Sequence, residues 1–170
     1  MKRLHSFLII FCFSLFIVSC STDEDDNIES SVVGVWDLTE LNIANLSVDL
    51  NNDTVFNNNI LEEISCANNE ILTFEENGVV TSSDTFNSKV DIFLNTSGQY
   101  SANIECAQSG TIGFASSYIE TRNTVEFNGS TAELIGNQII RTFTNEIEIF
   151  DEAGTEVVET RDLILVYTRQ

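Results

Sequence analysis

The sequence predicts an all-β protein, an antiparallel up-and-down barrel of about eight strands that follows a signal peptide and a short acidic tether. Short segments in which apolar and polar residues alternate recur from residue 33 to residue 169, as half-buried strands require. Turn-forming pairs such as Asn77-Gly78 and Asn128-Gly129 separate these segments at short intervals. Helical periodicity is confined to residues 60–64. Eight to ten strands with so little helix are typical of an antiparallel barrel or sandwich.

The N-terminus has the features of an export signal. Lys2 and Arg3 precede an apolar run from Leu4 to Val18. This run is shorter than the roughly 20 residues that a stable bilayer span needs, so it predicts a secretory signal peptide.

The end of this run carries a more specific motif. Ile17-Val18-Ser19-Cys20 resembles the bacterial lipobox, in which the peptide is cleaved before Cys20 and acyl chains are attached to that residue. Such acyl chains would anchor the protein stably to a membrane. The alternative is an ordinary signal peptide that is cleaved elsewhere.

An acidic segment follows Cys20. Residues 21–26 read Ser-Thr-Asp-Glu-Asp-Asp, which resembles the surface-export signal of Bacteroidota lipoproteins. The resemblance implies a lipid-anchored protein of the outer membrane, displayed at the cell surface. A plain solvated tether on a periplasm-facing lipoprotein is the alternative. The predicted organisation is therefore a signal peptide at 1–19, a tether at 20–31 and a barrel domain at 32–170.

The charge balance argues against one class of function, the binding of nucleic acids. The chain has 27 acidic and seven basic residues, and residues 32–170 retain 22 and five of them. Nucleic-acid binding is not expected, because it requires a basic patch that displaces counterions from phosphates. His5 is the single histidine and leaves with the signal peptide.

The first half of the domain contains four predicted elements. A strand over 33–43 precedes an Asn-rich loop, and Asn59 is placed to cap a helix at 60–64. A hairpin follows, in which Asn77-Gly78 predicts a type I′ turn. Its strands cover 70–76 and 79–83.

The second half is predicted to be entirely β. Ile139, Phe143, Ile147 and Ile149 share one face of a long strand, with Arg141 between them. The last strand contains the apolar run 163–167, which predicts the most buried strand. The expected strands are 89–94, 99–106, 111–119, 124–127, 131–135, 139–149 and 156–169.

Two cysteines remain in the domain once Cys12 and Cys20 are assigned to the signal peptide and the lipid anchor. An exported setting favours a disulfide between Cys66 and Cys106. Free thiols or a metal site are the alternatives, although no histidine is present to complete a zinc site.

Several motifs together resemble the lipocalin-like lipoproteins of Bacteroidota. They are Gly34-x-Trp36 on the first strand, Cys66 just before residues 71–78, Cys106 about 40 residues later, and Arg169 after the last strand. The resemblance implies an eight-stranded barrel with a pocket at one end. It implies that Gly34 permits tight packing at the closed end, that Trp36 plugs the barrel floor, and that Arg169 packs on Trp36. The Thr-Asp-x-x-Tyr pattern of true lipocalins is absent.

The resulting functional hypothesis is an outer-membrane lipoprotein whose barrel binds a small hydrophobic ligand. The alternative is a structural or interaction module of the cell envelope with a filled barrel. No enzyme activity, cofactor or metal is expected, because the domain has no histidine to pair with a nucleophile and no Gly-rich phosphate loop. Asp53-Thr54-Val55 resembles an O-glycosylation sequon of Bacteroidota, with an ordinary loop threonine as the alternative.

Overall fold

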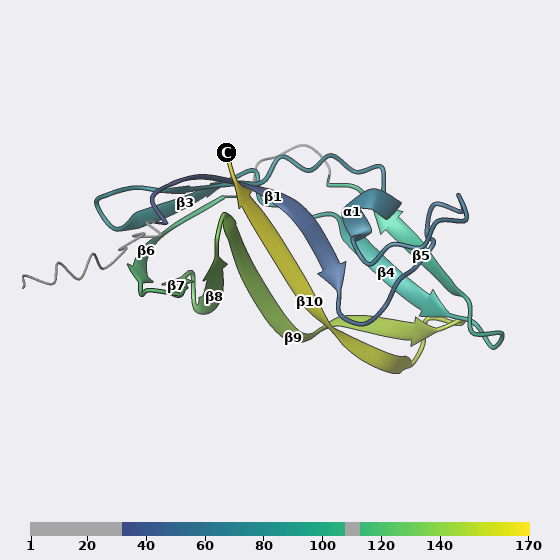
Figure 1. Cartoon of the computed structure of the whole chain (residues 1–170). Helices are drawn as coiled ribbons and strands as arrows, with labels where there is room; N and C mark the ends of the chain where they lie inside the picture. The colour runs from purple at the N-terminus through teal and green to yellow at the C-terminus, as the bar shows by residue number, and fades with distance from the viewer. Residues whose placement is uncertain (1–31, 108–112) are drawn as a thin grey trace, which may run out of the picture.

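The computed structural model describes residues 32–107 and 113–170, and eight of its strands close into an antiparallel barrel (Figure 1). Neighbours around the ring follow one another along the chain except between β3 and β6, and β10 closes it by pairing with both β1 and β9. The predicted fold class is confirmed, and the closed ring is consistent with a lipocalin-like fold. Its strands are β1 (Gly34–Ile43), β2 (Ile71–Phe74), β3 (Val79–Ser83), β6 (Phe114–Glu120), β7 (Thr124–Phe127), β8 (Ser130–Ile135), β9 (Gln138–Asp151) and β10 (Val157–Arg169).

Two predicted strands form a hairpin outside the ring. This hairpin consists of β4 (Lys89–Leu94) and β5 (Tyr100–Glu105). A short parallel pairing attaches it to the barrel, because Ile92–Leu94 lie against Ile149–Asp151 of β9. β9 is 14 residues long, and its second half leaves the ring and offers this attachment.

The long strands bend where their pairing is interrupted. In β9, Asn145 has a φ of 55°, and the pairing with β10 skips from Phe143–Leu163 to Ile147–Arg161. The Asn145 N–H donates to a carboxylate oxygen of Asp162 at 2.9 Å. This bulge bends β9 and β10 so that one half of each strand belongs to the ring and the other half extends beyond it (Figure 1).

The two Asn-Gly turns differ. Asn128 and Gly129 have φ values of 46° and 75°, as a type I′ turn requires. At the other turn the type I′ prediction is wrong, since Gly78 alone has a positive φ, 82°. The Gly78 N–H donates to the Glu75 carbonyl at 3.1 Å, so the loop has three residues and a glycine bulge.

The predicted helix is present as α1 (Ile60–Glu63). The Asn59 side chain accepts a hydrogen bond from the Leu61 N–H at 3.1 Å and caps the helix, as predicted. Among the described residues, no helix has the length and apolar character needed to cross a bilayer.

Two apolar clusters fill the molecule. The barrel cluster is built around Trp36, Phe74 and Phe127 and occupies the ring interior. The outer cluster lies between β4, α1 and the extended halves of β1, β9 and β10, and contains Ile43, Ile60, Ile92 and Ile149.

The prediction that residues 163–167 form the most buried strand is wrong for most of the run. Val166 and Tyr167 are buried, but Leu163, Ile164 and Leu165 are half-buried. Leu163 and Leu165 pack against the outer cluster at its junction with the ring, and Ile164 lies between them on the opposite face of the strand.

Candidate functional site

One end of the barrel carries Trp36 and Arg169, which are cross-strand partners on β1 and β10. The Arg169 guanidinium lies over the Trp36 ring, 4.8 Å from its centroid, and donates to the Val33 carbonyl at 2.8 Å. The Trp36 side chain is 1% exposed, and its ring N–H donates to the Val32 carbonyl at 2.8 Å. The indole is thus held inside the barrel by packing on one side and a cation above it.

Gly34 lies at the same end of the barrel. The resemblance implies that glycine permits tight packing there, but the structure gives a different reason for glycine at this position. A Cβ at Gly34 would lie 3.6 Å from Nε of Arg169, which is an ordinary contact. The φ of Gly34 is 140°, a conformation that residues with a Cβ rarely adopt. Glycine is therefore required here by the backbone, and the three residues of the Gly-x-Trp and Arg resemblance do lie together.

The middle of the barrel contains a buried hydrogen bond between Tyr167 and Glu70. The Tyr167 hydroxyl donates to Glu70 Oε1 at 2.7 Å, and the Phe86 N–H donates to Glu70 Oε2 at 2.9 Å. Glu70 is 4% exposed and Tyr167 is 0% exposed. Both carboxylate oxygens therefore have a partner, which offsets the cost of burying this charge.

Arg141 supplies a positive charge to the same interior. Its Nη2 donates to the Ser130 hydroxyl at 2.6 Å. The guanidinium lies 4.5 Å from the ring centroid of Phe127 and 5.0 Å from that of Phe143. Arg141 is buried among aromatic faces and bonded to the Ser130 hydroxyl, an arrangement that suits the planar, weakly hydrated guanidinium.

The electrostatics of Tyr167 reflect both neighbours. Burial raises the pKa of Tyr167 far above its usual 10.0, and the negative charge and hydrogen bond of Glu70 raise this pKa further. Arg141 opposes the rise through its charge and a hydrogen bond. The hydroxyl of Tyr167 consequently lies between the influence of an internal carboxylate and that of an internal guanidinium, and it stays protonated at neutral pH.

Sequence reasoning did not identify Glu70, Arg141 and Tyr167 as a group. One signal was present, because Arg141 is the basic residue on the predicted apolar face of the 139–149 strand. A charge at such a position needs an internal partner. The partners lie 71 and 26 residues away along the chain, and nothing local in the sequence specifies them.

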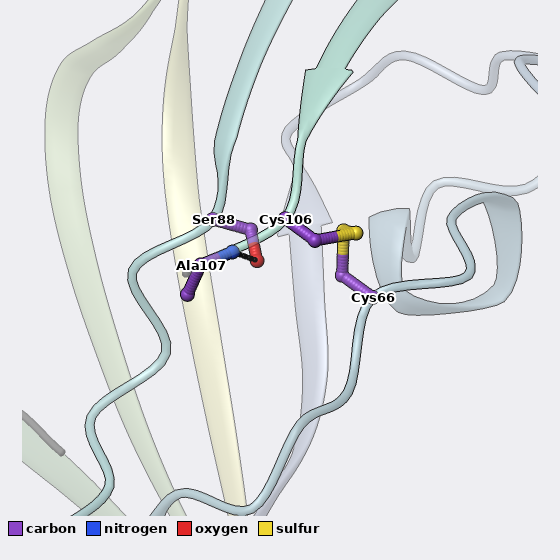
Figure 2. Close-up of a disulfide and its surroundings, with 4 residues drawn as sticks. All are labelled: Cys66, Ser88, Cys106 and Ala107. Atoms are coloured by element: carbon purple, nitrogen blue, oxygen red, sulfur yellow. Dashed lines mark hydrogen bonds between the residues drawn. A yellow bond between two sulfur atoms is a disulfide. The ribbon is translucent and has the colours of Figure 1, made fainter. Parts of the chain in front are cut away.

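The structure contains the disulfide between Cys66 and Cys106, across 40 residues of sequence. It joins the segment after α1 to the end of β5, and the Ala107 N–H donates to the Ser88 hydroxyl beside it at 3.3 Å (Figure 2). The bridge therefore fastens the end of β5 to the loop that follows α1, and the Ser88–Ala107 hydrogen bond holds the residue before β4 close to it. The predicted lipidation site, Cys20, lies outside the described residues.

Comparison with known proteins found no relative of this chain. No protein-family model matches the chain, and neither the curated proteins nor the solved structures contain a significant match. Within the described residues, no cluster of three or more His, Cys, Asp or Glu side chains has the arrangement of a metal site.

Proposed function

We propose that this chain is a lipoprotein of the outer membrane, anchored through acyl chains on Cys20 and displayed at the cell surface, whose barrel serves as an interaction module of the envelope. The observation that carries the second half of this proposal is the packing of the barrel interior. Trp36, Phe74 and Phe127 are each 1% exposed, and Tyr167 is 0% exposed. Eight-stranded barrels are narrow enough for side chains alone to fill them.

The aromatic side chains support a filled interior because they contact one another directly. The ring of Phe74 meets those of Tyr118 and Phe127 edge-on, with centroids 5.1 and 5.2 Å away. Phe114 stacks on Phe127 at 6.4 Å. A ligand of several carbon atoms would have to displace these rings, and every such contact would be lost.

The outer surface supports an interaction role. The loop between β1 and α1 exposes Val55 and Phe56 by 54% and 67%. β1 runs for ten residues, about 33 Å, from the barrel end that carries Trp36 to the start of this loop. With the tether attached before β1, this loop would face away from the membrane. Val55 and Phe56 are adjacent, so they form a small exposed apolar patch, and contiguous apolar patches are the surfaces that partners contact.

A second candidate function is the binding of a small hydrophobic ligand. The half-buried Leu61, Phe86 and Leu165 favour it, because they lie where the barrel cluster meets the outer cluster. Movement of Phe86 would open the ring interior from this side. Arg141 would then offer a charge to a ligand with an acidic group.

Two experiments test the proposal. For anchoring, cells that make the full-length chain are labelled with radioactive palmitate and fractionated. We expect label in the outer-membrane fraction for the wild type and none for Cys20→Ala. Ser19→Ala is the control, since it retains a small residue before the cysteine. Protease added to intact cells should degrade the protein if it is displayed outside, whereas protection would indicate the periplasm-facing alternative.

For the barrel, the protein is purified from its own membranes and studied by native mass spectrometry. A filled barrel gives the mass of the lipidated chain alone, before and after incubation with lipid extract. Retention of a noncovalent lipid by the wild type, and its loss in Phe86→Trp, would favour the ligand-binding function instead.

A further inference from the structure

Among the described residues, the outer edge of β5 has no neighbouring strand, and we call it the open edge. Every strand of the ring has at least two neighbours in this part of the chain, whereas β5 is the last strand of the sheet and pairs there with β4 alone. Within residues 32–107 and 113–170, the backbone groups of 101–105 make no hydrogen bond to any segment other than β4. The side chains of Ser101, Asn103 and Glu105 are exposed.

The hairpin turn decides which backbone groups point to this edge. The Asn95 N–H donates to the Gln99 carbonyl at 3.0 Å, so these two residues form a hydrogen-bonded pair. Hydrogen-bonded and non-hydrogen-bonded pairs alternate along an antiparallel ladder. The pairs Leu94–Tyr100, Ile92–Ala102 and Val90–Ile104 are consequently not hydrogen-bonded to each other, and their backbone groups point away from the hairpin partner. The N–H and C=O groups that face the open edge are those of Tyr100, Ala102 and Ile104.

This edge has few of the features that usually prevent strand pairing. Proteins protect open edges with charged side chains, proline, bulges or very short strands. Residues 99–104 read Gln-Tyr-Ser-Ala-Asn-Ile and include no charge and no proline, Glu105 at the end is the one charged residue of β5, and the register with β4 is unbroken. On a domain with 22 acidic residues, this uncharged stretch is a place where a second acidic molecule can approach.

We propose that β5 pairs with β5 of a second copy of this chain, antiparallel and about a two-fold axis at Ala102. The axis places Ala102 opposite its own copy, Tyr100 opposite Ile104 and Ser101 opposite Asn103. Because the outward-facing groups are all at even positions, this register uses each of them. In this register, hydrogen-bonded residue pairs form between the two copies at Ala102 and at both Tyr100–Ile104 positions. A register shifted by two residues would form fewer hydrogen-bonded pairs.

The side chains fit the same register. Tyr100 packs against the outer cluster, and Ile104 has the same parity on the strand, so it points to the same face. Tyr100 of one copy and Ile104 of the other would form an aromatic–β-branched pair, a favourable combination across strands. Ser101 and Asn103 form a polar pair on the exposed face. Glu105 lies opposite Gln99, so no two carboxylates face each other. A two-fold interface must be complementary to itself, and this strand meets that condition.

The proposal names a partner for the interaction module proposed above, but it does not depend on membrane attachment. The net negative charge of each copy opposes their approach, so salt should strengthen the pairing by screening that repulsion. Binding of a basic partner at the same edge would weaken with salt.

The test uses the full-length chain in two differently tagged forms, Ser101→Cys and Asn103→Cys. Residues 101 and 103 of the two copies would be opposite each other in a non-hydrogen-bonded pair, with Cα atoms about 4.5 Å apart, which is within the range for a disulfide. Residue 101 and its own symmetry copy would lie diagonally across the two strands, outside that range. Under mild oxidation we expect the mixture to cross-link at least tenfold more than either form alone. Ser101→Cys mixed with Thr131→Cys on β8 is the matched control.

A second variant separates pairing from folding. Ala102→Pro removes an N–H that faces the open edge and leaves the bonds to β4 in place. With unchanged far-UV circular dichroism, we expect its sedimentation to be monomeric, while the wild type shifts toward dimer as salt rises from about 20 to about 500 mM. Equal cross-linking of all cysteine combinations would overturn the proposal, as would a dimer that persists in Ala102→Pro. The proposal would also be overturned if an unrelated extended peptide bound the open edge of β5 while the wild-type chain formed no dimer at any salt concentration.

Discussion

The hydroxyl of Tyr167 donates a 2.7 Å hydrogen bond to the carboxylate of Glu70, and this bond joins residues 97 positions apart in the middle of the barrel. Glu70 immediately precedes β2, and Tyr167 lies near the end of β10. β1 lies between these two strands in the ring, so the bond crosses the interior beneath it. It ties an early strand of the barrel to the last one.

Replacement of Tyr167 by phenylalanine should destabilise the protein by about 1–3 kcal/mol, because one oxygen of the buried Glu70 carboxylate loses its donor. Urea unfolding of the purified chain measures this loss. Tyr118→Phe is the matched control, since its hydroxyl donates at the surface to the Glu75 carbonyl, 2.8 Å away. We expect Tyr118→Phe to cost less than about 1 kcal/mol, and equal losses in the two variants would contradict the internal role of Tyr167.

Stability should fall at alkaline pH. The pKa of Tyr167 is raised in the folded state above its usual 10.0, first by burial and then by Glu70. The stabilisation from protonated Tyr167 is therefore fully present below pH 10 and is lost as pH rises toward the folded pKa, because the unfolded chain ionises first. Absorbance near 295 nm should show Tyr100 and Tyr118 ionising before unfolding and the third tyrosine ionising only with it. In Tyr167→Phe this last step should disappear; a third tyrosine that ionises reversibly in the folded protein would refute the assignment.

Arg141 and Glu70 should be energetically coupled. Arg141→Met leaves the Glu70 charge without an internal counter-charge and should cost about 3 kcal/mol or more. Combined with Glu70→Gln, which removes that charge, the loss should be smaller than the sum of the single losses by about 0.5–3 kcal/mol. A double-mutant cycle from urea unfolding measures the difference. Strict additivity would mean that the two charges do not influence one another.

Loss of the disulfide should affect the appended hairpin more than the ring. Replacing both Cys66 and Cys106 by alanine opens a loop of 40 residues and should cost about 4 kcal/mol in the chain-entropy model. Hydrogen exchange should show the largest loss of protection in β5 and α1, because the bridge joins those regions. Equal loss of protection in β2 and β7 would show that the hairpin and the ring unfold as one unit.

Gly34→Ala should cost about 1–3 kcal/mol, because alanine is strained at a φ of 140°. The nearest Arg169 atom would be at 3.6 Å, which is no clash. Removing the guanidinium with Arg169→Ala should therefore not rescue Gly34→Ala in thermal unfolding. Rescue would mean that crowding, and not backbone conformation, selects glycine here.

The sequence by itself determined the local features of this protein. Alternation identified the segments that became strands, since side chains in a strand alternate between two faces. The Asn59 cap, the positions of the two Asn-Gly turns and the type I′ conformation of Asn128-Gly129 were readable because they depend on neighbouring residues. Pairing of Cys66 with Cys106 was also accessible, because only two cysteines remain in the domain.

Tertiary structure decided how those segments are used. Alternation does not tell a ring strand from an appended one, so the position of β4 and β5 outside the barrel depended on the length and bend of β9. The three-residue turn at Gly78 and the partial burial of 163–167 were likewise set by pairing and packing. Glu70, Arg141 and Tyr167 meet only because closure of the ring brings β2, β9 and β10 around one interior, and contacts between residues so distant in sequence leave no local pattern.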